Sequence, residues 1–182
     1  MFNHLLVTIP ANAFAGLTSL QTLDLSRGIL TTVTPGAFNG AAALQSLDLS
    51  SNHIASLPAH AFAGLTGLST LSLNSNALSS LHPDALAGLA SLTALYLNSN
   101  HLTALPASLL QGLARLTLLY LDPDVSGCYP IFPANPLFVV CNGMECSQSG
   151  VLPAWFPLCS GGGPPPPAPR PCSTGSARRS TR

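Results

Sequence analysis

Residues 44–67 read LQSLDLSSNHIASLPAHAFAGLTG, and a shift of 24 residues aligns this stretch with most of the first two thirds of the chain. Complete copies of the unit occupy residues 20–43, 44–67, 68–91 and 92–115. The back half of a unit precedes them at 1–19, and 116–125 opens a further unit that then decays. The sequence therefore predicts a repeat domain over 1–125.

The start of each unit has the spacing of a β-strand. Leu47 and Leu49 lie two residues apart, so both point to one face of a strand and Asp48 points to the other. A single coil cannot bury its own leucines, and stability has to come from neighbouring coils packed on one another. We therefore expect the leucines to face inward and the strands of successive coils to lie side by side.

The back half of each unit predicts the return path. In Leu57-Pro58-x-x-x-Phe62-x-Gly64, proline is tolerated at the start of a helical turn and glycine marks its end. This pattern predicts short helical or 3₁₀ pieces. The aromatic position and its equivalents should form a second stack, made by Phe14, Phe38, Phe62, Leu86 and Leu110.

An asparagine follows the strand of most units. Where the backbone turns inward, N–H and C=O groups lose their partners in the sheet, and an asparagine side chain offers both a donor and an acceptor. Asn52, Asn76 and Asn100 should therefore stack as a ladder. His4, Gly28 and Asp124 stand in the same column, so we expect the ladder to lose a rung at its ends.

The pattern Leu44-x-x-Leu47-x-Leu49-x-x-Asn52 and its copies resemble the typical class of leucine-rich repeat, found in Toll-like receptors, Slit proteins and small leucine-rich proteoglycans. The resemblance covers roughly two thirds of the chain. It implies an α/β solenoid: a curved stack with a parallel β-sheet on the concave face and short helical or 3₁₀ turns on the convex face. It also implies a module that holds a partner on the concave face.

In such a solenoid, the side chains between the inward leucines form columns on the solvent face of the strands. The predicted partner-binding residues are Thr22, Asp24, Ser26, Ser46, Asp48, Ser50, Thr70, Ser72, Asn74, Tyr96, Asn98, Leu118, Tyr120 and Asp122. Tyr96 and Tyr120 are the strongest candidates, because tyrosine is enriched in binding hot spots. The alternatives are that Tyr120 packs under the carboxyl-terminal flank, and that the small polar residues only keep the sheet soluble.

Several function classes are disfavoured. Charged residues are only 7% of the chain and lysine is absent, which argues against nucleic acid as a partner. The five histidines do not converge on one face, and no catalytic triad can be assembled from them. Asp24 and Asp48 alone make a poor calcium site, which requires six to eight oxygens. We expect no enzyme, no metal and no cofactor, and no segment long enough to span a membrane as a helix.

The residues after the repeats have a different composition. All the cysteines lie there, at Cys128, Cys141, Cys146, Cys159 and Cys172. Clustered cysteines indicate an oxidising compartment, with two disulfides drawn from the first four and one thiol left over, although the pairing is open and no signal peptide is visible. We assign 126–160 to a cysteine-containing flank, in which Asn135-Pro136-x-Phe138-x-x-Cys141 resembles the closing flank of extracellular arrays without its paired cysteines. The Gly/Pro-rich tail at 161–182 is expected to be disordered.

The sequence thus favours an extracellular or cell-surface module that recognises a protein or glycan. A competing interpretation is a cytoplasmic scaffold whose cysteines are reduced and whose Pro164–Pro171 run recruits a proline-binding domain. A third is a fragment of a larger leucine-rich-repeat receptor, because residues 1–19 lack the strand of their unit. The ligand and the oligomeric state are not determined by the sequence.

Overall fold

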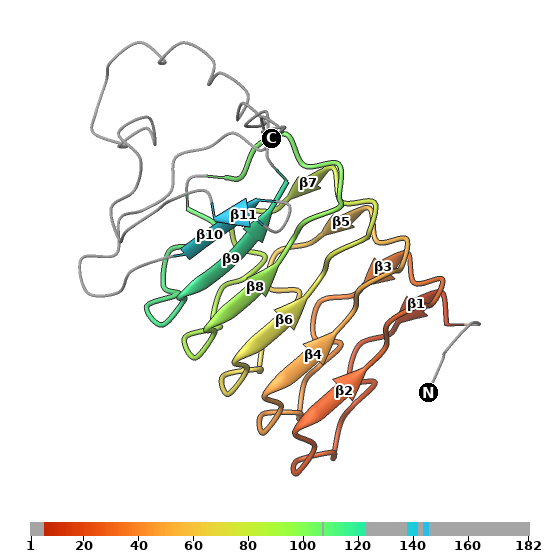
Figure 1. Ribbon diagram of the computed structural model, residues 1–182. Helices are drawn as coiled ribbons and strands as arrows, with labels where there is room; N and C mark the ends of the chain where they lie inside the picture. Colours follow the sequence, from red (N-terminus) through yellow and green to blue (C-terminus); the bar gives the residue numbers. More distant parts are fainter. Residues whose placement is uncertain (1–5, 107, 123–137, 142–143, 146–182) are drawn as a thin grey trace, which may run out of the picture.

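The structure of the chain, a computed structural model, describes residues 6–106, 108–122, 138–141 and 144–145. These residues form a stack of coils whose strands run in the same direction from one coil to the next (Figure 1). The stacked coils confirm the predicted leucine-rich-repeat solenoid. The described residues contain no helix that is long and apolar enough to cross a membrane.

One large sheet runs the length of the stack, in the strand order β11-β10-β9-β8-β6-β4-β2. Its strands are β2 (Thr22–Asp24), β4 (Ser46–Asp48), β6 (Thr70–Ser72), β8 (Ala94–Tyr96), β9 (Leu118–Leu121), β10 (Phe138–Cys141) and β11 (Met144–Glu145). From β2 to β9 the parallel pairs keep a constant offset of 24 residues, as in Leu23 with Leu47. This confirms the predicted parallel sheet, and its register equals the sequence period.

The large sheet continues beyond the repeats. Strand β10 pairs in parallel with β9, and β11 then pairs with β10 in the antiparallel sense. Both strands belong to the segment that we assigned to the cysteine-containing flank. The flank therefore covers the last repeat strand with backbone hydrogen bonds, which removes the exposed sheet edge that β9 would otherwise present.

A second, shorter set of strands lies on another side of the coils. It consists of β1 (Thr8–Ile9), β3 (Thr32–Val33), β5 (Ser56–Leu57) and β7 (Ser80–Leu81). These strands form two separate pairs, β1 with β3 and β5 with β7.

Proline explains why this second sheet is interrupted. The N–H of Thr34 donates to the carbonyl oxygen of Ile9 at 3.3 Å. Two coils later, the N–H of His82 makes the equivalent 3.3 Å bond to the carbonyl oxygen of Leu57. Pro58 stands at the same repeat position in the coil between them, and it has no N–H to give to Val33. The ladder therefore lacks this bond between β3 and β5.

The convex side differs from the prediction. The described residues contain no helix there, and the chain instead forms consecutive turns in which each bond joins residues three apart. In one coil, Ala63 N–H donates to His60 at 3.1 Å and Leu65 N–H donates to Phe62 at 3.3 Å. His60 and Gly64 have φ angles of 55° and 91°, whereas a right-handed helix needs negative φ. In this coil, the two left-handed residues separate the turns and keep them from propagating as a helix.

The core lies between the two sets of strands and is made mostly of leucine. Inward leucines such as Leu47 and Leu71 are fully buried. On the convex side, the ring centroids of Phe14 and Phe38 lie 5.4 Å apart and those of Phe38 and Phe62 lie 5.8 Å apart. Leu86 continues this stack as a buried residue, so the predicted second stack is present.

Asparagine side chains join neighbouring coils where the chain leaves the large sheet. The Oδ1 of Asn52 accepts the Leu30 N–H at 3.0 Å, and its Nδ2 donates to the carbonyl oxygens of Leu25 at 2.9 Å and Leu49 at 3.0 Å. Leu25 and Leu30 belong to the preceding coil. Asn76 and Asn100 repeat these contacts one and two coils later. The three side chains form a ladder that satisfies backbone groups within the stack.

Candidate partner-binding surface

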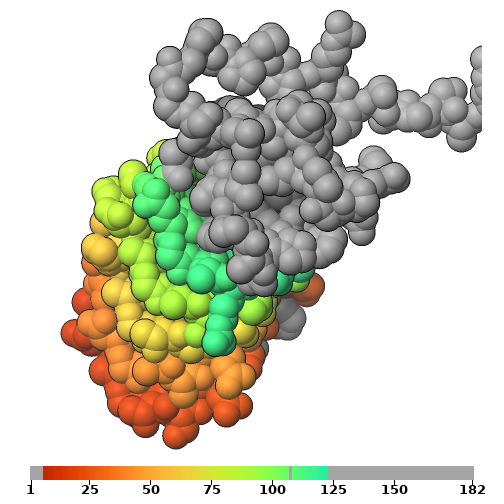
Figure 2. All heavy atoms as spheres, turned by 90° about the vertical axis from the view of Figure 1, so that its left-hand side faces the viewer, coloured from red at the N-terminus to blue at the C-terminus, as the bar shows by residue number. Residues whose placement is uncertain are grey.

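We use the term strand face for the outward side chains of β2 to β9 and of the residues that follow each strand. It comprises Thr22, Asp24, Ser26, Ser46, Asp48, Ser50, Thr70, Ser72, Asn74, Ala94, Tyr96, Asn98, Leu118, Tyr120 and Asp122. All of these side chains are exposed or half-buried, because the strands alternate between inward leucines and outward residues. Figure 2 shows the coils that carry them as successive bands, from the red first coil to the green last one.

The composition of the strand face changes along the stack. In the central column, Asp24 pairs with Asp48 in register, and Tyr96 pairs with Tyr120. The neighbouring column follows the same parallel register. It begins with Thr22 and Ser46 at one end and finishes with Ala94 and Leu118 at the other. In these two columns one end is therefore acidic and polar and the other is aromatic and apolar, while a third column ends in the carboxylate of Asp122.

The two tyrosines are stacked on each other. Their ring centroids lie 4.8 Å apart and their planes are inclined by 16°. This separation matches the ~4.8 Å between adjacent strands, so the sheet register itself sets the contact. Both side chains are only half-buried. Tyr96 and Tyr120 thus present an ordered aromatic surface with two hydroxyl groups.

The two aspartates are held by the residues that follow them. Asp24 Oδ1 accepts the Ser26 N–H at 2.9 Å, and Asp48 Oδ1 accepts the Ser50 N–H at 2.8 Å. Hydrogen bonds from the Ser26 side chain and backbone lower the pKa of Asp24 below its usual value, and the nearby positive charge of Arg27 contributes in the same direction. The acidic end of the face therefore carries negative charge at neutral pH.

Asp122 has a structural contact that distinguishes it from the other members of the face. Its Oδ1 accepts the Ser99 N–H at 2.8 Å and its Oδ2 accepts the Asn100 N–H at 3.0 Å. In the coils before it, Ser75 N–H instead donates to the backbone carbonyl of Asn98 at 3.0 Å. Asp122 thus closes the last described loop of the ladder, and both of its carboxylate oxygens are already used.

Other sequence predictions lie outside the described residues. These are the candidate disulfide residues Cys128, Cys146 and Cys159, together with His4, Asp124 and the whole tail at 161–182. Cys141 is described only as the last residue of β10.

No cluster of side chains that could hold a metal ion is found among the described residues. No group of three or more His, Cys, Asp or Glu side chains comes together there. A histidine and a carboxylate do approach each other in one turn of the described part, where His82 Nδ1 lies 3.8 Å from Asp84 Oδ2. The N–H of Asp84 donates to the same Nδ1 at 3.1 Å. Both side chains are about half exposed, and the contact serves the local turn.

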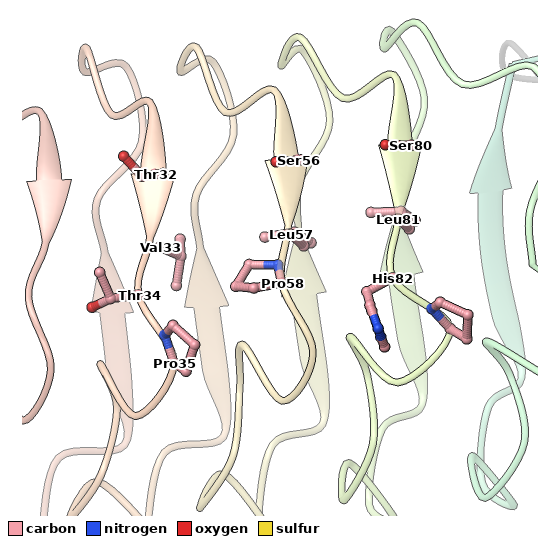
Figure 3. Close-up of a pocket in the computed structure, with 11 residues that line it drawn as sticks. Thr32, Val33, Thr34, Pro35, Ser56, Leu57, Pro58, Ser80, Leu81 and His82 are labelled. Carbon is pink, nitrogen blue, oxygen red and sulfur yellow. The ribbon is translucent and has the colours of Figure 1, made fainter.

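Sequence reasoning missed one surface feature, an open groove of about 600 Å³ on the side of β3, β5 and β7. It is lined by Thr32, Val33, Thr34, Pro35, Ser56, Leu57, Pro58, Ser80, Leu81, His82 and Pro83. In Figure 3, Val33 and Pro58 lie in the interval between β3 and β5, where the second sheet is interrupted. The sequence feature that could have indicated the groove is the position of the proline in each unit. Pro35 and Pro83 share one repeat position, whereas Pro58 stands one position earlier in its unit.

Two comparisons with known proteins bear on the chain. A family model described as leucine rich repeat matches residues 1–54 and 42–102. No curated protein matches the chain.

Proposed function

Because the chain belongs to the leucine-rich-repeat family, we propose that it is a non-enzymatic recognition module that binds a protein partner on the strand face. Repeats of this family generally mediate recognition between proteins, and stacked coils create extended surfaces suited to it. The surface offered by this chain is the parallel sheet from β2 to β9, and the flank strand β10 lies beside its apolar end.

The observation that carries the proposal is the stacked pair Tyr96 and Tyr120. Binding orders the side chains of an interface, and each mobile side chain that becomes fixed reduces the affinity. Two rings that already support each other on a rigid sheet lose little freedom when a partner covers them. Leu118 and Ala94 lie on the adjacent column, so the rings are the centre of a patch that a partner could desolvate.

We further propose that the protein works outside the cell or at its surface. The support is the cluster of five cysteines beyond the repeats, a distribution typical of a disulfide-stabilised flank. Titration of thiols on the natively purified chain tests this proposal. One reactive thiol supports two disulfides, whereas five reactive thiols support a cytoplasmic scaffold with a proline-rich recruiting tail.

Binding to an array of extracellular proteins and glycans tests the proposed function. The wild-type chain is compared with the variant Tyr96→Ala/Tyr120→Ala, and the control is His53→Ala/His101→Ala, which removes two exposed side chains that lie off the strand face. We expect a protein ligand that is lost with the tyrosines and kept in the control. A ligand bound equally by all three would place the site elsewhere, and hits confined to glycans would change the ligand class.

A further inference from the structure

A single column of side chains crosses the strand face from its acidic to its aromatic end. It consists of Asp24, Asp48, Ser72, Tyr96 and Tyr120. Adjacent strands lie ~4.8 Å apart, so two register positions that are two strands apart are separated by about 10 Å along the stack. Asp48 and Tyr96 have this relationship, with Ser72 between them.

Asp48 is less exposed than Asp24, but its carboxylate is the one of the two on which no nearby arginine among the described residues is found to act. Its carboxylate accepts the Ser50 N–H, and no other hydrogen bond or ion pair to it occurs within the described part of the chain. Asp24 is similar, but the positive charge of Arg27 acts on it. Because Asp48 is half-buried, a cation bound there would be partly shielded from water.

We propose that the strand face binds an extended polypeptide segment along this column, with an aromatic or large apolar side chain on Tyr96 and Tyr120 and an arginine or lysine at Asp48. An extended polyproline II chain has three residues per turn and advances ~3.1 Å per residue, so a basic residue three positions from the anchor lies about 9 Å away on the same side of the peptide. Arginine suits the position best, because its guanidinium matches the geometry of a carboxylate. The inference rests on the proposed function and specifies the chemistry of its partner.

Electrostatics favours a peptide over a glycan at this column. Sulfated or uronic-acid glycans are anionic, and the negative charge at Asp24 and Asp48 would repel them. A neutral glycan could stack on the tyrosines but would leave the carboxylates without a cation. A basic and aromatic peptide satisfies both ends of the face at once.

A displayed library of short random peptides, selected on the immobilised full chain and counter-selected on Tyr96→Ala/Tyr120→Ala, tests this proposal. We expect enriched peptides that contain an aromatic residue and an arginine or lysine about three residues away. An enriched peptide should bind Asp48→Asn about three- to fivefold more weakly than wild type, since an ion pair that is only partly shielded from water contributes modestly. Asparagine keeps an acceptor for Ser50 N–H, so the strand end should persist.

The control is Asp84→Asn, which removes one exposed negative charge away from the strand face and should leave the affinity unchanged. Equal binding to Asp48→Asn and wild type, or enriched peptides without a basic residue at this spacing, would overturn the inference while the tyrosine site stands. A selection in which no peptide distinguishes the tyrosine variant from wild type would overturn both the inference and the proposed function.

Discussion

The backbone N–H of Leu30 donates to the side-chain oxygen of Asn52, which lies 3.0 Å away in the next coil. The same asparagine donates to carbonyl oxygens in both coils. It is 5% exposed, so water cannot readily replace these contacts. A repeat protein is stabilised by contacts between neighbouring coils, and this column supplies the polar part of each such contact.

Replacing Asn76 by alanine should lower the free energy of unfolding by about 1–3 kcal/mol, because buried backbone groups would lose their hydrogen-bond partner. The change is measured by chemical denaturation of the purified chain. Asn74→Ala is the matched control, since Asn74 is half-buried on the strand face. If both variants were as stable as wild type, the asparagine ladder would have no energetic role.

Replacing Leu73 by alanine should destabilise the chain by about 2–5 kcal/mol, because Leu73 is fully buried and its truncation leaves a cavity. Ser72→Ala, at the neighbouring outward position, should change stability by less than about 0.5 kcal/mol. Thermal or denaturant unfolding measures both variants. A small effect at Leu73 together with a large effect at Ser72 would mean that the inward and outward positions had been exchanged.

Replacing Asp122 by alanine should loosen the last described loop of the ladder without unfolding the first coils. The Ser99 and Asn100 N–H groups would lose the carboxylate that accepts them. Amide hydrogen exchange should therefore accelerate at these two residues. Asp122→Asn keeps one acceptor oxygen and should have a smaller effect. Unchanged protection in the alanine variant would show that the carboxylate does not close the loop in solution.

The carboxyl group of Asp24 should titrate below the usual range of an aspartate, because hydrogen bonds from Ser26 lower its pKa in the folded chain. A lowered folded pKa means that the unfolded state binds the proton more tightly. The resulting stabilisation is fully present above the unfolded value and is lost as pH falls through the folded one. A carboxyl chemical-shift titration by NMR measures the midpoint. The lowering of the Asp24 pKa should be smaller in Ser26→Ala. A midpoint at or above that of an aspartate in an unstructured peptide would contradict the Ser26 contact.

The strands and the inward leucines could be predicted from the sequence because two periods agree. A side-chain period of two identifies the strand around Leu47, and the 24-residue period fixes its register with Leu71. The convex turns could not be predicted in the same way. In the coil 44–67, Gly64 signals a positive φ, but nothing about His60 indicates that it also adopts one, and together these two residues separate the turns where a helical piece was expected.

The strand pairing of the flank and the contacts of some single side chains could not be predicted from the sequence either. Strand β10 lies after the end of the repeat pattern, so the 24-residue period does not predict its pairing with β9. The column of Asp122 predicts an outward side chain, yet a short carboxylate beside two unpaired N–H groups turns to accept them. The stacking of Tyr96 on Tyr120, by contrast, follows directly from their equivalent positions in adjacent coils.

Recognition through the strand face is tested by measuring the affinity of a protein ligand for three proteins. These are the wild type, Tyr96→Phe/Tyr120→Phe and Tyr96→Ala/Tyr120→Ala. Each variant is first shown by its melting temperature to be folded. We expect affinity to fall about tenfold or more in the alanine variant, as for hot-spot residues, and to fall less in the phenylalanine variant, which keeps the rings. Equal affinity of all three proteins for the ligand would contradict recognition through the strand face.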